Sequence, residues 1–257
     1  MEIAIIAITA LIASALTLFC GFGLGTLLMP VVAIFFPVEI AIAITAIVHL
    51  AANLFKFALL GSRADKSVVF RFGGPALIAS FAGAFCLVWL STLPAIGQYT
   101  LGTTVRQVMP IKVIVGALIL AFVFIERSPL FASRSIKPSM LPIGGIISGF
   151  FGGLSGNQGA LRSMFLIKAG LNKEQFIATG IVIAVFIDVA RMSIYGWDMV
   201  TKHRGLDWML IAVACIAAFI GVFVGSRLIA KVTIAAIETI VTVLLVAVAI
   251  GLIVGIL

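Results

Sequence analysis

Eight apolar segments, each long enough to cross a lipid bilayer, follow one another along this chain and leave no stretch for a soluble domain. They lie at about 3–36, 38–61, 68–93, 108–126, 140–167, 174–196, 206–228 and 232–256. About 20 helical residues, at a rise of about 1.5 Å each, span the hydrocarbon core. Because 63% of the residues are hydrophobic and only 10% are charged, the sequence predicts an all-α, polytopic membrane protein.

The surplus of basic residues, 17 Lys and Arg against nine Asp and Glu, is explained by membrane topology. Basic residues of membrane proteins gather in cytoplasmic loops, so we expect no nucleic-acid partner. One loop carries Arg63, Lys66 and Arg71, and the linker at 127–138 is also basic. We expect both on the cytoplasmic side, and the loop at 94–109 on the opposite side.

Cysteine and histidine are too few and too scattered to form a conventional cofactor site. Cys20, Cys86 and Cys215 stand singly within apolar segments, and His49 and His203 are far apart in the chain. This spacing matches neither a disulfide framework nor a metal motif. We therefore expect no metal and no cofactor.

Glycines interrupt the first and fifth segments, which are also too long for one simple span. The first contains GFGLG at 21–25, and the fifth contains GFFGGLSGNQGALRSMF at 149–165. Non-helical backbone survives at membrane depth only where protein buries it or where it lines an aqueous cavity. Such breaks in matching positions of two repeats indicate a transporter's binding site. The alternative is that the glycines serve close helix packing.

An offset of 135 residues aligns the two halves of the chain. It pairs Gly21 with Gly156, Asn53 with Asp188, and Lys56 with Arg191. We therefore predict two transmembrane repeats of four segments, at 1–126 and 139–257, joined by a cytoplasmic linker at 127–138. If the broken segments each cross the membrane, the repeats are parallel. If they are re-entrant, the repeats are inverted, which we favour.

The two breaks together predict a site for a small anion. A helix that restarts after each break has unsatisfied N–H groups and a partial positive charge at its first turn, which favours an anion. Side-chain donors and Arg162 add to this charge in the second half. The predicted substrate-binding residues are Gly21, Gly23, Gly25, Ser155, Gly156, Asn157, Gln158, Gly159 and Arg162.

A second polar group is predicted for ion coupling, with a proton or sodium as the ion, or for support of the site. Asp188 and Arg191 share a helix face at i, i+3 and can pair, for structure or for coupling. Lys56 is expected to extend to the membrane surface, with Asn53 as the neutral counterpart of Asp188. His49 is either a hydrogen-bonded packing residue or a proton relay.

The two turns, GFGLGTLLMP and GLSGNQGALRSMF, resemble those of the TauE/SafE family, also called sulfite exporters or toluene-sulfonate uptake permeases. The resemblance covers nearly the whole chain, although Leu24 replaces one glycine of the family's run and Asn157 and Gln158 interrupt the other. It implies a secondary transporter, and no enzyme. Its substrate is expected to be sulfite, a sulfonate or another small organic anion, carried across the bacterial plasma (inner) membrane by alternating access.

Two other functional classes remain open from the sequence. An anion channel would share the composition and the polar site. The stretch GLSG also matches the nucleophile motif of rhomboid intramembrane proteases, with Ser155 as the nucleophile. A nucleophilic serine needs a nearby base, for which the chain offers only His49 and His203. The oligomeric state is open, with a homodimer as one option.

Overall fold

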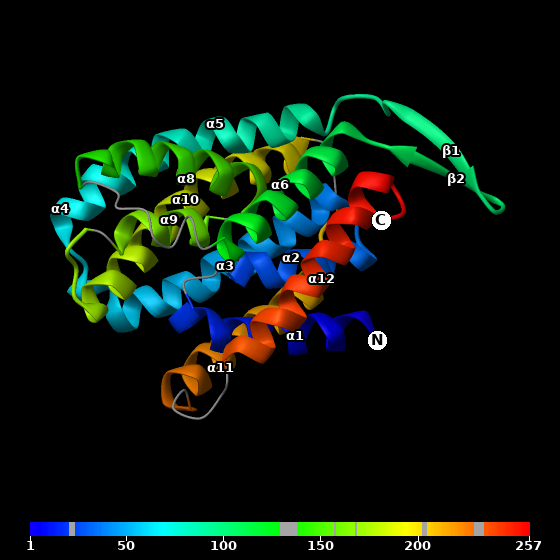
Figure 1. The fold of residues 1–257 in the computed structure, drawn as a ribbon. Helices are drawn as coiled ribbons and strands as arrows, with labels where there is room; N and C mark the ends of the chain where they lie inside the picture. The colour runs from blue at the N-terminus through cyan, green and yellow to red at the C-terminus, as the bar shows by residue number, and fades with distance from the viewer. Residues whose placement is uncertain (21–23, 129–137, 157, 168, 202–204, 229–233) are drawn as a thin grey trace.

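The computed structural model describes residues 1–20, 24–128, 138–156, 158–167, 169–201, 205–228 and 234–257, and it is almost entirely helical (Figure 1). The α-helices are α1 (Glu2–Cys20), α2 (Leu24–Phe35), α3 (Val38–Leu60), α4 (Lys66–Val68), α5 (Gly74–Leu90), α6 (Pro110–Arg127), α8 (Leu141–Ser155), α9 (Gly159–Leu166), α10 (Lys173–Thr201), α11 (Trp208–Leu228) and α12 (Ile234–Val254). A π-helical turn at Val69–Gly73 joins α4 to α5, and 3₁₀ turns lie at Gly61–Arg63 and Pro138–Met140.

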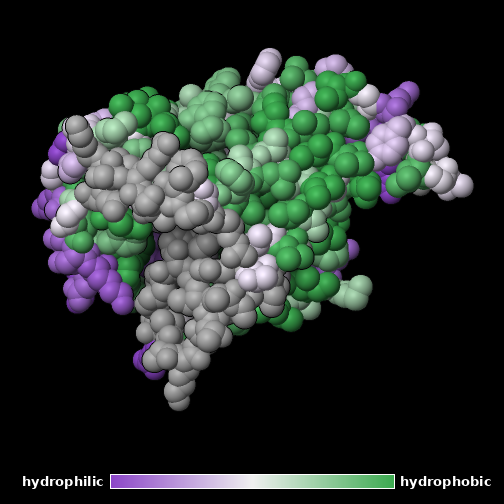
Figure 2. Space-filling model, in the orientation of Figure 1, coloured by the Kyte–Doolittle hydropathy of each residue, from purple (hydrophilic) through white to green (hydrophobic). Residues whose placement is uncertain are grey.

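Four stretches of the described helices are long and apolar enough to cross a membrane. They are Val38–Arg63, Lys66–Leu90, Lys173–Asp198 and Trp208–Gly225. Shorter apolar helical stretches lie at Glu2–Thr17, Pro110–Ile125 and Leu245–Val254. The chain is therefore a multi-pass membrane protein, while the reading as eight segments in two repeats stays a prediction. Figure 2 shows the apolar side chains over the length of the helices and the hydrophilic ones mainly at the two ends.

The prediction of a purely α-helical chain is wrong between α5 and α6, where the structure contains a β-hairpin. Strands β1 (Gly97–Leu101) and β2 (Thr104–Val108) pair antiparallel around a two-residue turn in which Gly102 has φ 64°. The alternating, β-branched sequence TVRQV was the available signal. The hairpin contacts the carboxyl end of α12, where Tyr99 and Arg106 donate to backbone carbonyls at 2.8 and 3.0 Å. It thereby satisfies carbonyls that a helix end leaves unpaired.

Close packing of α8 on α5 explains several of the glycines. In α8 they recur every four residues, which places them on one face of the helix. A Cβ added at these positions would lie 2.1–2.2 Å from backbone carbonyl oxygens of α5 or the turn before it; the pairs are Gly145–Phe72, Gly149–Ala76 and Gly153–Ser80. In the same way Gly221 and Gly225 of α11 face the backbone of α1. The packing alternative is therefore correct for Gly149 and Gly153, which belong to the second glycine-rich stretch.

Helices α3 and α10 lie side by side and run in opposite directions (Figure 1). At one end Arg63 Nη1 lies 2.8 Å from Glu174 Oε2, and near the middle Asn53 reaches Asp188. Their central polar residues consequently meet inside the helical bundle, at a distance from either end of the helices.

Candidate functional site

A reversal of the chain between α8 and α9 forms one wall of the site. Helix α8 ends at Ser155, and Gly156 caps it in the left-handed conformation with φ 80°. Glycine is the residue that adopts this conformation without strain. Helix α9 then runs back along α8, because Phe165 packs against Gly144 and Gln158 packs against Gly152. The two helices form a hairpin that returns toward its starting end.

The first glycine-rich stretch reaches the same place. A Cβ added at Gly25, in the first turn of α2, would lie 3.4 Å from the carbonyl oxygen of Gly156. Two segments 131 residues apart in the chain therefore come into contact at Gly25 and Gly156. Gly21, Gly23 and Asn157, also predicted for the site, lie outside the described residues.

Asp188 is the centre of a buried hydrogen-bond network. Its Oδ2 lies 2.7 Å from His49 Nδ1 and accepts a bond of 2.9 Å from Asn53. Its Oδ1 accepts bonds from Arg191 Nε at 3.0 Å and from Gln158 Nε2 at 3.4 Å. Asp188, Arg191 and Gln158 are completely buried, and His49 and Asn53 are nearly so. The network joins α3, α10 and the start of α9.

Lys56 and Arg162 add positive charge beside this network. Lys56 is only 5% exposed and donates to Thr17 Oγ1 at 3.2 Å, so the expectation that it extends to the membrane surface is wrong. Its ammonium is held inward because α1 supplies an acceptor there. Arg162 donates to Gln158 Oε1 at 3.3 Å and packs against Gly180 of α10. The charges of both residues interact with that of Asp188.

The cluster therefore carries an excess of positive charge. Arg191, Lys56 and Arg162 face the single carboxylate of Asp188, and Arg191 pairs with it directly, with Nη2 at 2.9 Å from Oδ1. Buried charge is costly unless it is compensated. Among the described residues, no carboxylate pairs directly with Lys56 or Arg162, which suits the binding of an anion.

Asn53 and Asp188, which the predicted alignment of the two halves pairs, are hydrogen-bonded to each other across 135 residues. Lys56 and Arg191 form a second pair in that predicted alignment. Lys56 bonds α1 through Thr17, while the Arg191 guanidinium lies beside Gly156. The two predicted halves differ at the first of these pairs: Asn53 on α3 is a neutral amide, whereas Asp188 on α10 is a carboxylate.

Three further polar side chains support the site and were not predicted from the sequence. Thr17 accepts from Lys56, Ser148 donates to the carbonyl of Gln158 at 3.2 Å, and Tyr195 donates to the carbonyl of Gly153. The available signal was their position, because each is a polar residue within an apolar segment. Among the described residues, no three His, Cys, Asp or Glu side chains gather into a possible metal site.

Ser155 lies at the end of α8 and donates its hydroxyl hydrogen to Phe151 O at 3.1 Å. We expect Ser155→Ala, which removes this bond, to lower stability by about 1 kcal/mol and to change anion affinity by about threefold or less. Two assays on the parent protein and the Ser155→Ala variant test this expectation: anion binding and cleavage of a labelled transmembrane peptide. Peptide cleavage that disappears in the variant would instead identify a serine protease.

The fold and the site together define a multi-pass membrane protein built around a buried, charged centre. The family model described as "Sulfite exporter TauE/SafE" matches residues 6–252. The chain belongs to this family of membrane transporters, which confirms the resemblance seen in its glycine-rich turns. No curated protein and no solved structure matches the chain.

Proposed function

We propose that this protein is a secondary transporter that moves a small sulfur-containing or organic anion across the bacterial inner membrane. The observation that carries the proposal is the charge of the cluster, in which the buried Lys56 and Arg191 and the half-buried Arg162 face Asp188 as the cluster's one carboxylate among the described residues. An anion bound between Lys56 and Arg162 would compensate the charges that the protein leaves unbalanced. Sulfite, sulfonates and small carboxylates carry negative charge and present several oxygen acceptors.

Backbone donors add to the proposed anion site. Helix α9 begins at Gly159 and α2 begins at Leu24, and the first N–H groups of a helix have no partner within the helix. Each helix start carries a partial positive charge of about half an elementary charge. Gly25 in the first turn of α2 approaches Gly156, three residues before the start of α9, so the two positive helix starts lie near each other and favour the same class of ligand.

The packing of the helices supports inverted repeats and alternating access between them. Helix α1 packs on α11 as α8 packs on α5, and the two helices of each pair run parallel. The helices α3 and α10, which the predicted repeat makes equivalent, run antiparallel. This is the arrangement produced by a two-fold axis in the membrane plane. The hydrogen bond between the equivalent residues Asn53 and Asp188 would lie close to that axis, and therefore near the bilayer midplane.

The ends of the helices support an orientation in the membrane. Arg63, Lys66, Arg71 and Lys173 lie at the end of the bundle that holds α4 (Figure 1). Basic residues favour the cytoplasmic side, so this end is assigned to the cytoplasm, together with the linker at 127–138. The two termini and the β-hairpin would then face the opposite side.

Loss of one cation from the cluster tests the proposed site. We expect Arg162→Gln and Lys56→Gln each to weaken anion binding by about tenfold or more, because a charged hydrogen bond contributes about 1.5–3 kcal/mol. Lys112→Gln, at the far end of α6, is the matched control and should bind as the parent does. Thermal stabilisation by sulfite, thiosulfate, sulfoacetate and small carboxylates measures binding, since a hundredfold excess of ligand over Kd adds about 2.7 kcal/mol.

Flux in proteoliposomes distinguishes the transporter from an anion channel. A transporter gives saturable flux that depends on a gradient of a coupling ion, and Asp188 with His49 is the pair through which a proton would act. Flux that stays linear with concentration and ignores both proton and sodium gradients would identify a channel. Unchanged binding and flux of every candidate anion in both variants would refute the site.

A further inference from the structure

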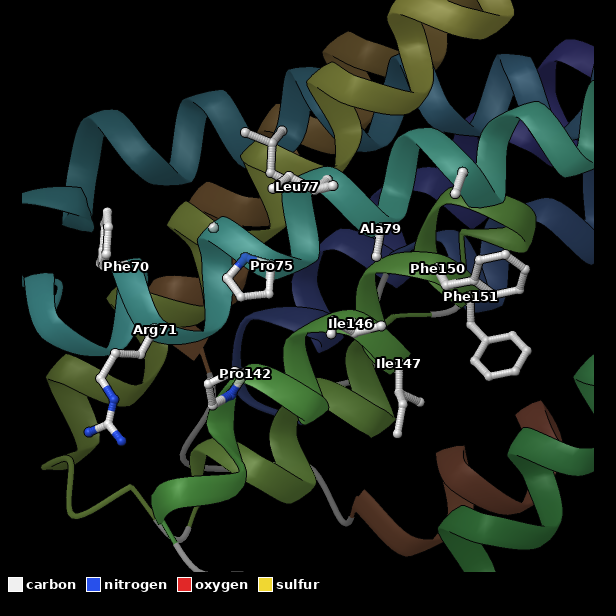
Figure 3. A pocket seen from close by; sticks show the side chains of 13 residues that line it. Phe70, Arg71, Pro75, Leu77, Ala79, Pro142, Ile146, Ile147, Phe150 and Phe151 are labelled. Atoms are coloured by element: carbon white, nitrogen blue, oxygen red, sulfur yellow. The ribbon is translucent and has the colours of Figure 1, made fainter.

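An apolar groove runs along the outer face of the bundle between α5 and α8 (Figure 3). One wall is formed by α5 and the π-helical turn before it, from Phe70 to Ala82, and the other by α8, from Pro142 to Phe151. Its volume is about 1120 Å³. Several side chains at its rim are strongly exposed, among them Phe70 at 81% and Ile78 at 74%. The described part of the bundle therefore leaves the side chains at this rim exposed.

The groove follows a helix that is a candidate membrane span, and its length is about the depth of one leaflet. It follows the stretch Lys66–Leu90, which is long and apolar enough to span a bilayer. From Phe70 to Ala82, 12 residues of helix extend about 18 Å, slightly more than half of a hydrocarbon core of about 30 Å. A lipid acyl chain entering at one membrane surface would fill it down to the midplane.

Among the described residues that line the groove, Arg71 at its outer end is the only one with a charged side chain. Figure 3 shows its guanidinium beyond the apolar side chains, as a group at the membrane surface would lie. Its Nη2 donates to the carbonyl of Pro138 at 3.3 Å, which uses one of the five N–H donors of a guanidinium. The remaining donors suit a phosphate. Lys66, a few residues earlier, adds positive charge at the same end.

The matching position in the other half carries no charge. After a three-residue insertion the offset between the halves becomes 138, which aligns Arg71 with Met209, an exposed residue at the start of α11. In the proposed orientation Arg71 faces the cytoplasmic leaflet and Met209 the other one. Anionic lipids of the cytoplasmic leaflet attract basic protein segments that lie beside that leaflet.

We propose that this groove binds one anionic phospholipid of the cytoplasmic leaflet, with an acyl chain between α5 and α8 and the phosphate on Arg71. The far end of the groove is connected to the proposed anion site through helix α8. Phe151 lines it, and its carbonyl accepts the Ser155 hydroxyl directly before the Gly156 turn. A bound lipid therefore supports the part of α8 that positions this turn.

Lipid retention by the purified protein tests the proposal. Native mass spectrometry counts the phosphatidylglycerol or phosphatidylcholine molecules that stay bound at equal concentrations of both. We expect the parent protein to retain one phosphatidylglycerol with about a tenfold preference. Arg71→Gln should lose the preference and keep the weaker binding of phosphatidylcholine, because only the phosphate contact is removed. Lys112→Gln, with the same change of charge elsewhere, should keep the preference.

A variant that fills the groove provides a second test. A side chain at Gly74 would meet no atom within 4 Å of its Cβ, so Gly74→Leu should occupy the groove without disturbing the fold, and both lipids should be lost. Gly196→Leu is the matched control on α10, because its Cβ also meets nothing within 4 Å. Equal retention of both lipids by the parent protein, or unchanged retention by Gly74→Leu, would overturn the proposal. So would efficient crosslinking of Ile78→Cys into a dimer in membranes, which would assign the groove to a second copy of the chain.

Discussion

Replacing Asp188 with Asn is expected to lower the stability of the protein by about 3–5 kcal/mol, because Arg191 would remain completely buried without its carboxylate. For a chain of this length that corresponds to a fall in Tm on the order of 10 °C. His49 and Asn53 would lose a charged acceptor as well. Anion transport should be abolished, since the amide leaves no carboxylate to take up the coupling proton. Thermal unfolding in detergent and flux in proteoliposomes measure the two effects.

A second variant separates the structural effect from the functional one. Adding Arg191→Gln to Asp188→Asn removes both charges of the pair, so most of the lost stability should return. Transport should stay absent, because the cluster would then lack both its carboxylate and one of its cations. If the double variant transports anions at the rate of the parent protein, the network around Asp188 serves only the fold.

Replacing Gly149 with Val is expected to prevent α8 from packing on α5 and to abolish the folded protein. The added Cβ would lie 2.2 Å from the carbonyl oxygen of Ala76, well inside ordinary contact distance. Since the obstacle is backbone, the helices must move apart by about 1 Å, and the neighbouring contacts at Gly145 and Gly153 would be lost with it. Gel filtration of the detergent-solubilised protein should show aggregate in place of the parent peak.

The control for this variant is Gly196→Val. Gly196 also lies inside a long helix, but a Cβ there meets no atom within 4 Å, so the monodisperse peak should be retained. A folded, monodisperse Gly149→Val protein would show that the close contact between α8 and α5 is not required. The comparison isolates close helix packing from the general effect of a β-branched residue in a helix.

The glycine-rich stretch that begins at Gly149 illustrates how far the sequence could be interpreted. Its polar residues indicated a break and an anion site, and Gln158 and Arg162 do lie beside Asp188 and α10. The sequence could not separate glycines with different tasks. Gly149 and Gly153 contact the backbone of α5, whereas Gly156 reverses the chain. That distinction depends on which helix lies alongside, which a pattern within one segment does not contain.

Lys56 shows a second limit of interpreting the sequence, because its position in a segment did not reveal that it is buried. Its place near a segment end favoured extension to the membrane surface, yet it is buried against Thr17. The two residues are 39 positions apart, and only the packing of α1 near α3 supplies the acceptor. Thr17, Ser148 and Tyr195 were missed for the same reason, because a single polar residue in an apolar helix gives no indication of its partner.

The sequence by itself determined that this is a multi-pass helical membrane protein of the TauE/SafE family with polar groups at membrane depth. Hydrophobicity and length suffice for the class of protein, since a bilayer requires long apolar helices wherever they lie, and the two glycine-rich turns carry the resemblance to the family. Only the tertiary structure decided which polar groups meet. It brings His49 and Asn53 to Asp188 from a helix 135 or more residues away, because antiparallel packing of α3 on α10 sets that register. Long-range contacts of this kind, together with the charge imbalance that they create, define the proposed anion site.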